Sequence, residues 1–323
     1  MRLATFILKR LAYAIPLFLI SVSVIFVLVR LAPGDPVDFM LGETGASAEF
    51  VEQMRKDLGL DQPIYLQYIR YVRDVATGNL GYSYASRAPV FGLILERFPA
   101  TFLLMITQYF VAILLGIGLG VLSVRRPNSV FDNTVTVLSL ASFAIPAFWL
   151  GQMMILAFGY HLDLFPIQGM YDLRAGHRGF AVVLDVAYHM VLPVITLALL
   201  SLALIIRLTR GSMLQVIGQE YIKVARAKGL GERVVLLKHA LPNALLPVVT
   251  VIGMEFPGLI AGAVLTETVF AWPGLGRLTF DAVAGRDYPL LMGMFIFISA
   301  LVIIGNLLTD IVYAILDPRI RYR

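Results

Sequence analysis

Residues 100–124 read ATFLLMITQYFVAILLGIGLGVLSV, a run that contains no Asp, Glu, Lys or Arg. A helix needs about 20 mostly apolar residues to cross the hydrocarbon core of a bilayer. This run is long enough, and the basic pair Arg125 and Arg126 follows it directly. The stretch therefore predicts a membrane-spanning helix and places the chain among the integral membrane proteins.

Five further stretches meet the same requirement, at about residues 11–29, 134–158, 188–206, 245–269 and 289–315. The composition agrees, because 59% of the residues are hydrophobic and 15% are charged, whereas a soluble domain averages about 45–50% and about 25%. The first stretch is too long for a signal peptide, and residues 29–31 offer no small-residue cleavage site. We expect an all-α integral membrane protein with about six transmembrane helices.

Residue types that many reactions require are missing or scattered. The sequence has no cysteine, which excludes a disulfide framework, a thiolate metal site and a cysteine nucleophile. Its histidines, His161, His177, His189 and His239, form no pair at ligand spacing, so we expect no metal site. An enzyme would need clustered acid, base or metal groups facing a cavity, and no such cluster is visible.

The distribution of Lys and Arg predicts the orientation. Basic residues gather before the first stretch, after the second, after the fourth and at the end of the chain, whereas the short segments on the opposite side carry only Arg174, Arg178, Arg277 and Arg286. Cytoplasmic loops hold the excess of Lys and Arg, and long loops such as residues 32–99 are translocated largely regardless of charge. We expect both termini in the cytoplasm. The net charge of +5 then indicates no nucleic acid partner.

The outer segment, residues 32–99, opens with the turn-rich sequence PGDP at 33–36. Two amphipathic helices are predicted after it, one from about Ser47 to Gly59 and one from about Asp61 with an aromatic and aliphatic stripe. Such a stripe is typical of a face that packs on the membrane surface or on the protein body. Residues 90–98 are interpreted as a short interfacial helix before the second span.

The inner segment, residues 213–248, reads MLQVIGQEYIKVARAKGLGERVVLLKHALPNALLPV. Helical spacing of polar and apolar residues continues to Lys228, where Gly229 predicts a left-handed stop. A second amphipathic helix is predicted from about Gly231 to Leu241, closed by Pro242. This basic hairpin could anchor on anionic lipid or dock a soluble partner, and the pattern alone leaves both interpretations open.

The hairpin resembles the cytoplasmic EAA loop of ABC importer permeases, because YIKVARAKG at 221–229 is similar to the Y-I-x-x-A-R-A-K-G of the peptide-transporter branch. Lys223 replaces the usual Glu, as is common in that branch, and His239 stands where Ile is usual. Further motifs match in order: PGDP at 33–36, LGLD at 58–61, LTETVF and WPGLG within 265–276, RDYP at 286–289 and DPRIR at 317–321. The resemblance is to the first, B-type, permease of importers of dipeptides, oligopeptides, glutathione or nickel.

The resemblance implies the type I ABC importer permease fold. Residues 1–99 would hold the first transmembrane helix and the long extracytoplasmic loop, residues 100–316 the permease core with the coupling hairpin at about 213–248, and residues 317–323 a cytoplasmic tail. It also implies a multi-pass protein of a bacterial or archaeal plasma (inner) membrane.

The resemblance further implies the partners. They are a second, homologous permease subunit in a heterodimer, two cytoplasmic ATPase subunits, an extracytoplasmic substrate-binding protein and membrane lipid. The chain has no G-x-x-x-x-G-K-[ST] loop and no Gly-Lys dipeptide, so it cannot cradle ATP in the usual way. We expect no enzyme activity and no cofactor in this chain, with ATP and Mg²⁺ bound by the partner subunits.

The resemblance places candidate sites at two loops. The expected ATPase-coupling residues are Tyr221, Ala225, Ala227, Gly229, Leu241 and Pro242, and the expected extracytoplasmic partner contact is Trp272, Pro273 and Gly274. Ala225 and Ala227 are expected to face the ATPase groove, where added bulk would not fit.

Two residues inside the spans are candidates for the pore. Glu255 lies about ten residues into the fifth stretch, roughly 15 Å deep, so it should face the pore or a partner rather than lipid. A structural hydrogen bond to a neighbouring helix or to the second permease is the alternative. Pro146 is expected to kink the third span, either as a gating hinge or for shape alone.

Other residues in the spans are interpreted as structural. Gly116, Gly118 and Gly120 predict close helix packing. Asp310, near the cytoplasmic end of the last span, predicts an ion pair with a partner such as Arg207.

Two alternatives concern the overall function. A secondary transporter would also be all-helical, but such proteins commonly show internal repeats with paired broken helices, and no convincing repeat is visible. The cargo stays open between peptides, glutathione and nickel, because importers of all three share these motifs. The favoured hypothesis is half of the translocation pore of a dipeptide or oligopeptide importer.

Overall fold

The computed structural model describes residues 3–31, 48–57, 59–83, 85–260 and 263–316. These residues are mostly helical, with a single two-stranded hairpin among them, β1 (Tyr82–Ser83) paired antiparallel to β2 (Ala88–Pro89). The all-α prediction is confirmed. The predicted PGDP turn, the Ser47 cap and the C-terminal tail lie outside the described residues.

The chain divides into two compact units, and each is described by itself. The first comprises residues 1–101, 260–264 and 274–323, and the second comprises residues 102–259 and 265–273.

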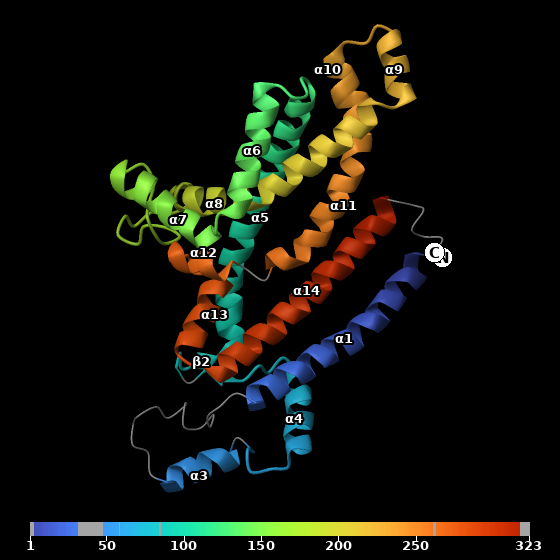
Figure 1. The fold of residues 1–323 in the computed structure, drawn as a ribbon. Coiled ribbons are helices and arrows are strands. Elements are labelled where there is room, and N and C mark those ends of the chain that lie inside the picture. Colours follow the sequence, from blue (N-terminus) through green and yellow to red (C-terminus); the bar gives the residue numbers. More distant parts are fainter. Residues whose placement is uncertain (1–2, 32–47, 58, 84, 261–262, 317–323) are drawn as a thin grey trace. The chain divides into compact units, whose positions relative to one another are not determined.

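In the first unit, the long helices α1 (Leu3–Leu31) and α14 (Tyr288–Leu316) lie side by side (Figure 1). The unit also holds α3 (Ala48–Asp57), α4 (Ile64–Ala76), α13 (Leu275–Ala284) and the start of α5 (Val90–Val124). Its core contains Val90, Ile94, Leu275, Leu290 and Met294.

The second unit begins with the rest of α5 and continues through α6 (Val130–Ala144), α7 (Ala147–Met154) and the π-helix η1 (Ile155–His161). The long α8 (Phe180–Ile217) leads into a hairpin made of α9 (Glu220–Ala227), α10 (Glu232–Val234) and the π-helix η2 (Val235–Ala240). The chain returns through α11 (Leu241–Ile260) and α12 (Val264–Val269).

Within the described residues, five helices are long and apolar enough to cross a membrane, and a bent pair makes a sixth possible span, in agreement with the predicted number. The bent pair, α6 with α7 and η1, corrects the predicted continuous span at 134–158, because its axis turns by 106°. Ile145 is extended (φ −86°, ψ 129°) and Pro146 precedes α7. A residue before proline avoids the α conformation, so the predicted kink at Pro146 is confirmed as a full break.

Three other predicted boundaries were wrong. Residues 90–98 are the first turns of α5, and the helix passes through Pro99. Pro242 does not close the hairpin, because η2 runs directly into α11 and the helix continues past the proline; the π-helical turn just before it already interrupts the regular hydrogen-bond ladder, as π-bulges inside helices do. The predicted span at 245–269 is divided, since α11 ends at Ile260 and α12 is a separate short helix.

The predicted stripe on α4 packs on α1 only in part, through Tyr68, with Tyr71 beside it, while Ile64, Tyr65 and Ile69 are exposed. The Tyr68 hydroxyl lies 2.6 Å from Ser23 Oγ, and the Tyr68 and Tyr71 rings lie 5.4 and 5.5 Å from Phe26. Burial removes water from the Tyr71 hydroxyl and raises its pKa above the ordinary value. Tyr68 and Tyr71 therefore hold the outer helix against the first span.

The glycine patch on α5 packs against α8 at two of its three positions. A Cβ at Gly116 would lie 2.6 Å from Ile205 Cγ2, and one at Gly120 would lie 2.7 Å from Thr209 Cβ. Gly118 faces open space. Close packing is thus confirmed for Gly116 and Gly120.

Candidate functional site

The hairpin between α8 and α11 turns at a glycine with left-handed backbone. Gly229 has φ +80°, and its N–H donates to the Arg226 carbonyl at 2.9 Å. Beyond Gly229 and its two chain neighbours, no atom lies within 4 Å of the place that a Cβ would take. The position therefore requires glycine for its backbone conformation and not for space, which confirms the predicted left-handed stop.

One face of the hairpin is buried against its own chain. Ile222, Ala225, Val235, Leu236 and Ala240 form a cluster with Met213 of α8 and the end of α5. Ala225 is 7% exposed, so the expectation that its side chain faces a partner groove was wrong. Its small size lets the two arms of the hairpin pack together, which ties the hairpin to the transmembrane helices.

Polar contacts fix the geometry of the hairpin. Arg226 donates to Glu232 through Nε (3.2 Å) and Nη2 (2.8 Å), and this contact raises the pKa of the Arg226 guanidinium. The pair is surface-exposed, so it orients the turn and adds little stability. The Asn243 amide donates to the Tyr221 hydroxyl at 2.9 Å and joins the first arm to α11.

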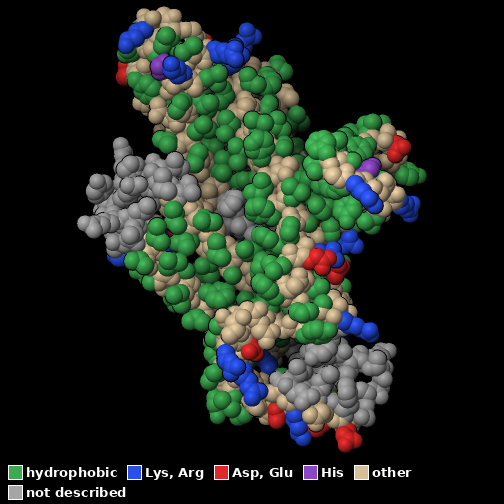
Figure 2. Space-filling view, turned by 180° about the vertical axis from the view of Figure 1, so that it is seen from behind, with side chains coloured by type: hydrophobic (Ala, Val, Ile, Leu, Met, Phe, Trp, Pro, Cys, Tyr) green, Lys and Arg blue, Asp and Glu red, His purple; other side chains and the backbone are tan. Residues whose placement is uncertain are grey.

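The other face of the hairpin is exposed and mixed in character. Its large apolar side chains are Tyr221, Val224, Leu230, Val234 and Leu237. Basic residues lie among them, at Lys223, Lys228, Arg233 and Lys238, and Ala227 is exposed as expected. Figure 2 shows Lys and Arg side chains interspersed with hydrophobic ones at the top of the view. A surface of this kind is typical of a site that contacts another protein or a membrane surface.

A buried ion pair supports the hairpin from within the second unit, and the sequence did not reveal it. Arg210 of α8 donates to both carboxylate oxygens of Asp132 in α6, at 2.6 and 2.7 Å. The Asp132 side chain is fully buried. Two parallel charge-assisted hydrogen bonds fix direction as well as distance, so α6 and α8 are rigidly connected below the hairpin. The Ser129 cap three residues before Asp132 was the only local signal.

Glu255 lines a pocket of about 370 Å³ in the second unit, together with Arg207, Ser201, Tyr109 and Phe143. The Tyr109 hydroxyl donates to the Ile252 carbonyl at 3.2 Å and holds α5 against α11 there. The ion pair predicted for Asp310 is confirmed, but its partner is Arg10 of α1, at 2.7 Å, and not Arg207. The structure thus brings Glu255 and Arg207 to one pocket, which the sequence did not suggest.

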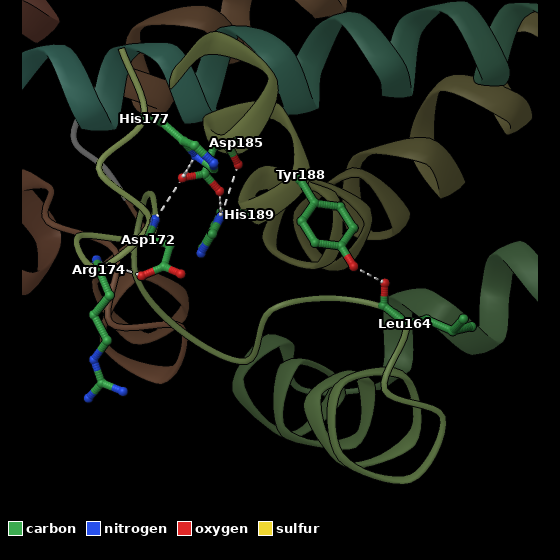
Figure 3. Close-up of polar contacts among 7 residues, drawn as sticks. All are labelled: Leu164, Asp172, Arg174, His177, Asp185, Tyr188 and His189. Atoms are coloured by element: carbon green, nitrogen blue, oxygen red, sulfur yellow. Dashed lines mark hydrogen bonds and ion pairs between the residues drawn. The ribbon is translucent and has the colours of Figure 1, made fainter. Parts of the chain in front are cut away.

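At the other end of α8, Asp185 connects a loop to the helix (Figure 3). Its carboxylate accepts from the Asp172 N–H at 2.8 Å and faces Nδ1 of His177 at 3.3 Å and of His189 at 3.0 Å. The Tyr188 hydroxyl donates to the Leu164 carbonyl at 2.6 Å. The scattered histidines therefore include two that meet at one carboxylate; the four-residue spacing of Asp185 and His189 was the available signal.

The turn at Trp272, Pro273 and Gly274 differs from its expected role. The Trp272 side chain is completely buried and Gly274 is buried as well. The Trp272 N–H donates to the Glu267 carbonyl at 2.8 Å. The prediction that Trp272 contacts a partner was wrong, because a large aromatic ring without exposed surface stabilises the core.

Known proteins resemble the chain along its whole length. The family model described as binding-protein-dependent transport system inner membrane component matches residues 112–322, and a model for the N-terminal part of such components matches residues 3–105. The dipeptide transport system permease protein DppB of Escherichia coli K12 is 42% identical, over 98% of this chain and 99% of that protein. The oligopeptide transport system permease protein AppB of Bacillus subtilis is 40% identical, over 99% of this chain and 100% of that protein.

A solved structure gives the fold. A chain from the MetNI methionine ABC transporter, in inward-facing conformations, superposes with a TM-score of 0.55 and 18% identity, over 70% of this chain and 96% of that chain. The likeness confirms the type I permease fold.

Proposed function

Because the chain belongs to the family of inner membrane components of binding-protein-dependent transport systems, we propose that it forms half of the translocation pore of a peptide importer. Proteins of this family are permease subunits of ABC transporters; the chain is a multi-pass membrane protein and not itself an enzyme, and ATP is hydrolysed by a separate subunit. Peptide cargo is proposed because the similar permeases belong to dipeptide and oligopeptide transport systems.

The exposed face of the hairpin is the single observation that carries the coupling mechanism. An ATPase subunit docks on Tyr221, Ala227 and the turn at Gly229, while Ala225 and Leu241 support that surface from inside and Pro242 begins the helix that follows. Because the opposite face is packed on α8 and the end of α5, a movement imposed on the hairpin displaces both helices. When ATP binding closes the two ATPase subunits on each other, the hairpin transmits the movement and the pore shifts from inward-open to outward-open. The free energy of ATP binding is thereby coupled to the equilibrium between the two pore states.

The remaining assembly follows from this role. A second permease completes the pore as a heterodimer, two ATPase subunits bind ATP and Mg²⁺, and a binding protein delivers cargo outside. The hairpin and both termini lie in the cytoplasm, and the segment before α5, residues 32–89, lies outside. Within the core at residues 100–316, Glu255 forms part of the pore wall and the break at Pro146 acts as a hinge. Pro273, which is partly exposed, remains the contact for the binding protein.

Reconstituted transport tests this proposal. The complete assembly in proteoliposomes is expected to accumulate a radiolabelled dipeptide only with ATP and the binding protein. Gly229→Val is expected to abolish uptake and loosen the ATPase, because Gly229 has φ +80°. Gly231→Val is the matched control, since Gly231 is exposed with φ −62°. Normal uptake with Gly229→Val would exclude the proposed docking of the ATPase at this turn. Uptake of nickel or glutathione in place of dipeptide would contradict the proposal that the cargo is a peptide.

A further inference from the structure

The pocket that contains Glu255 also contains an opposite charge. Glu255 projects from α11 and Arg207 from α8, and both side chains are exposed. Among the residues that the structure describes, neither forms an ion pair. A charged side chain within a membrane segment is costly unless it meets a partner or water. Asp310, the acid suggested as a partner for Arg207, pairs with Arg10 instead.

We propose that Glu255 and Arg207 bind the two charged ends of a short peptide as it passes through the pore. The peptide α-ammonium donates to the Glu255 carboxylate, and the Arg207 guanidinium donates to the peptide α-carboxylate. This inference rests on the proposed function and specifies its substrate class as zwitterionic dipeptides and tripeptides. A guanidinium suits the second role because its donors match both oxygens of a carboxylate.

The size and lining of the pocket agree with such a ligand. An extended chain spans about 3.3–3.6 Å per residue, and a cavity of about 370 Å³ lies in the size range of small-molecule sites. Both ends of a dipeptide therefore fit within one pocket. The other walls include Phe143, Leu204 and Ile252, which offer apolar surface without a matching hydrogen-bonding pattern. Recognition would depend on the peptide ends, which all unmodified peptides share, and not on the side chains.

A cysteine probe tests the site directly. The chain has no native cysteine, so Ser201→Cys places a single thiol in the pocket wall. Its alkylation by a small maleimide is measured in the purified complex of both permeases and both ATPases, with alanyl-phenylalanine, its N-acetyl form or its C-terminal amide. At about ten times its Kd, the free dipeptide is expected to slow alkylation about tenfold. Each blocked form loses a charge-assisted contact and is expected to bind about tenfold more weakly.

Two variants separate the roles of the charges. When Glu255→Gln is added to Ser201→Cys, the free and N-acetyl dipeptides are expected to protect the thiol equally from alkylation. When Arg207→Gln is added instead, the free and amidated dipeptides are expected to protect it equally. Leu246→Cys, an exposed position on α11 outside the pocket, is the control and should react at one rate throughout. Phe143→Cys replaces the probe if Ser201→Cys does not assemble.

The outcomes distinguish this inference from the proposed function. Equal protection by all three peptides, or no protection, in a complex that still imports dipeptide would overturn the charge-paired site and leave the importer intact. A wild-type complex that does not import dipeptide at all would overturn the proposed function. Unchanged discrimination in both glutamine variants would likewise contradict the site.

Discussion

The hairpin turn at 229–231 and the tryptophan turn at 272–274 use similar residues for opposite purposes. Each joins helices through a glycine next to apolar side chains. In the hairpin, Leu230 and Val234 are exposed at the turn, whereas Trp272 is completely buried. The first turn can therefore serve as a surface for another subunit. The second can only hold its own chain together, because no part of its large ring reaches the surface.

The largest effect is expected at the buried turn. Trp272→Ala removes a fully buried ring and should destabilise the chain by about 3–5 kcal/mol through lost burial and the cavity left behind. Thermal unfolding of the purified protein, or its yield in membranes, measures the loss. Tyr221→Ala at the hairpin is the matched aromatic control and should unfold almost as the wild type does. Equal stability of the two variants would contradict the conclusion that Trp272 is a core residue and Tyr221 a surface residue.

A second pair sharpens the comparison within one helix. Ile222 and Val224 are two residues apart on α9, the first buried and the second 52% exposed. Ile222→Ala should cost about 2–5 kcal/mol, while Val224→Ala should stay within about 0.5 kcal/mol and instead weaken co-purification with the ATPase. A Val224→Ala variant that binds the ATPase normally but unfolds at a lower temperature than the wild type would contradict the assignment of Val224 to the exposed, partner-binding face.

The smallest effect concerns the backbone. Gly229→Ala forces a Cβ into a left-handed conformation and should cost about 1–2 kcal/mol, seen as faster hydrogen exchange of the turn amides. Gly231→Ala occupies an ordinary conformation and should leave exchange unchanged or slower. Identical exchange in the two variants would show that the left-handed turn is absent from the protein in solution.

Periodicity predicted the elements well, and contacts poorly. The α4 stripe, the glycine stop at Gly229 and the kink at Pro146 each follow from local rules of backbone and side-chain chemistry, so they could be found from neighbouring residues. The Asp132–Arg210 pair joins residues 78 positions apart, and the placement of Glu255 and Arg207 in one pocket depends on how α5, α8 and α11 pack together. Nothing in the local sequence encodes such a distance.

Motif resemblance has a similar limit. It marked both Ala225 and Trp272 as important, but it could not tell a buried position from an exposed one. The hydrophobic pattern of a short turn is compatible with either, because burial is decided by the elements that fold over it. Burial in the structure therefore reassigns both residues from partner contact to support.

The central claim, that the exposed face of the hairpin receives an ATPase subunit, is tested most directly by cross-linking. Leu237→Cys introduces the only cysteine of this chain on an exposed part of η2. A short photoactivatable maleimide attached there, in the assembled transporter, is expected to give an adduct that contains the ATPase subunit and changes in yield on ATP binding. The same reagent attached to Val137→Cys, an exposed position on α6, should give no adduct with the ATPase subunit. Adducts to lipid alone at both positions would contradict the account and favour the membrane-anchor interpretation of the hairpin.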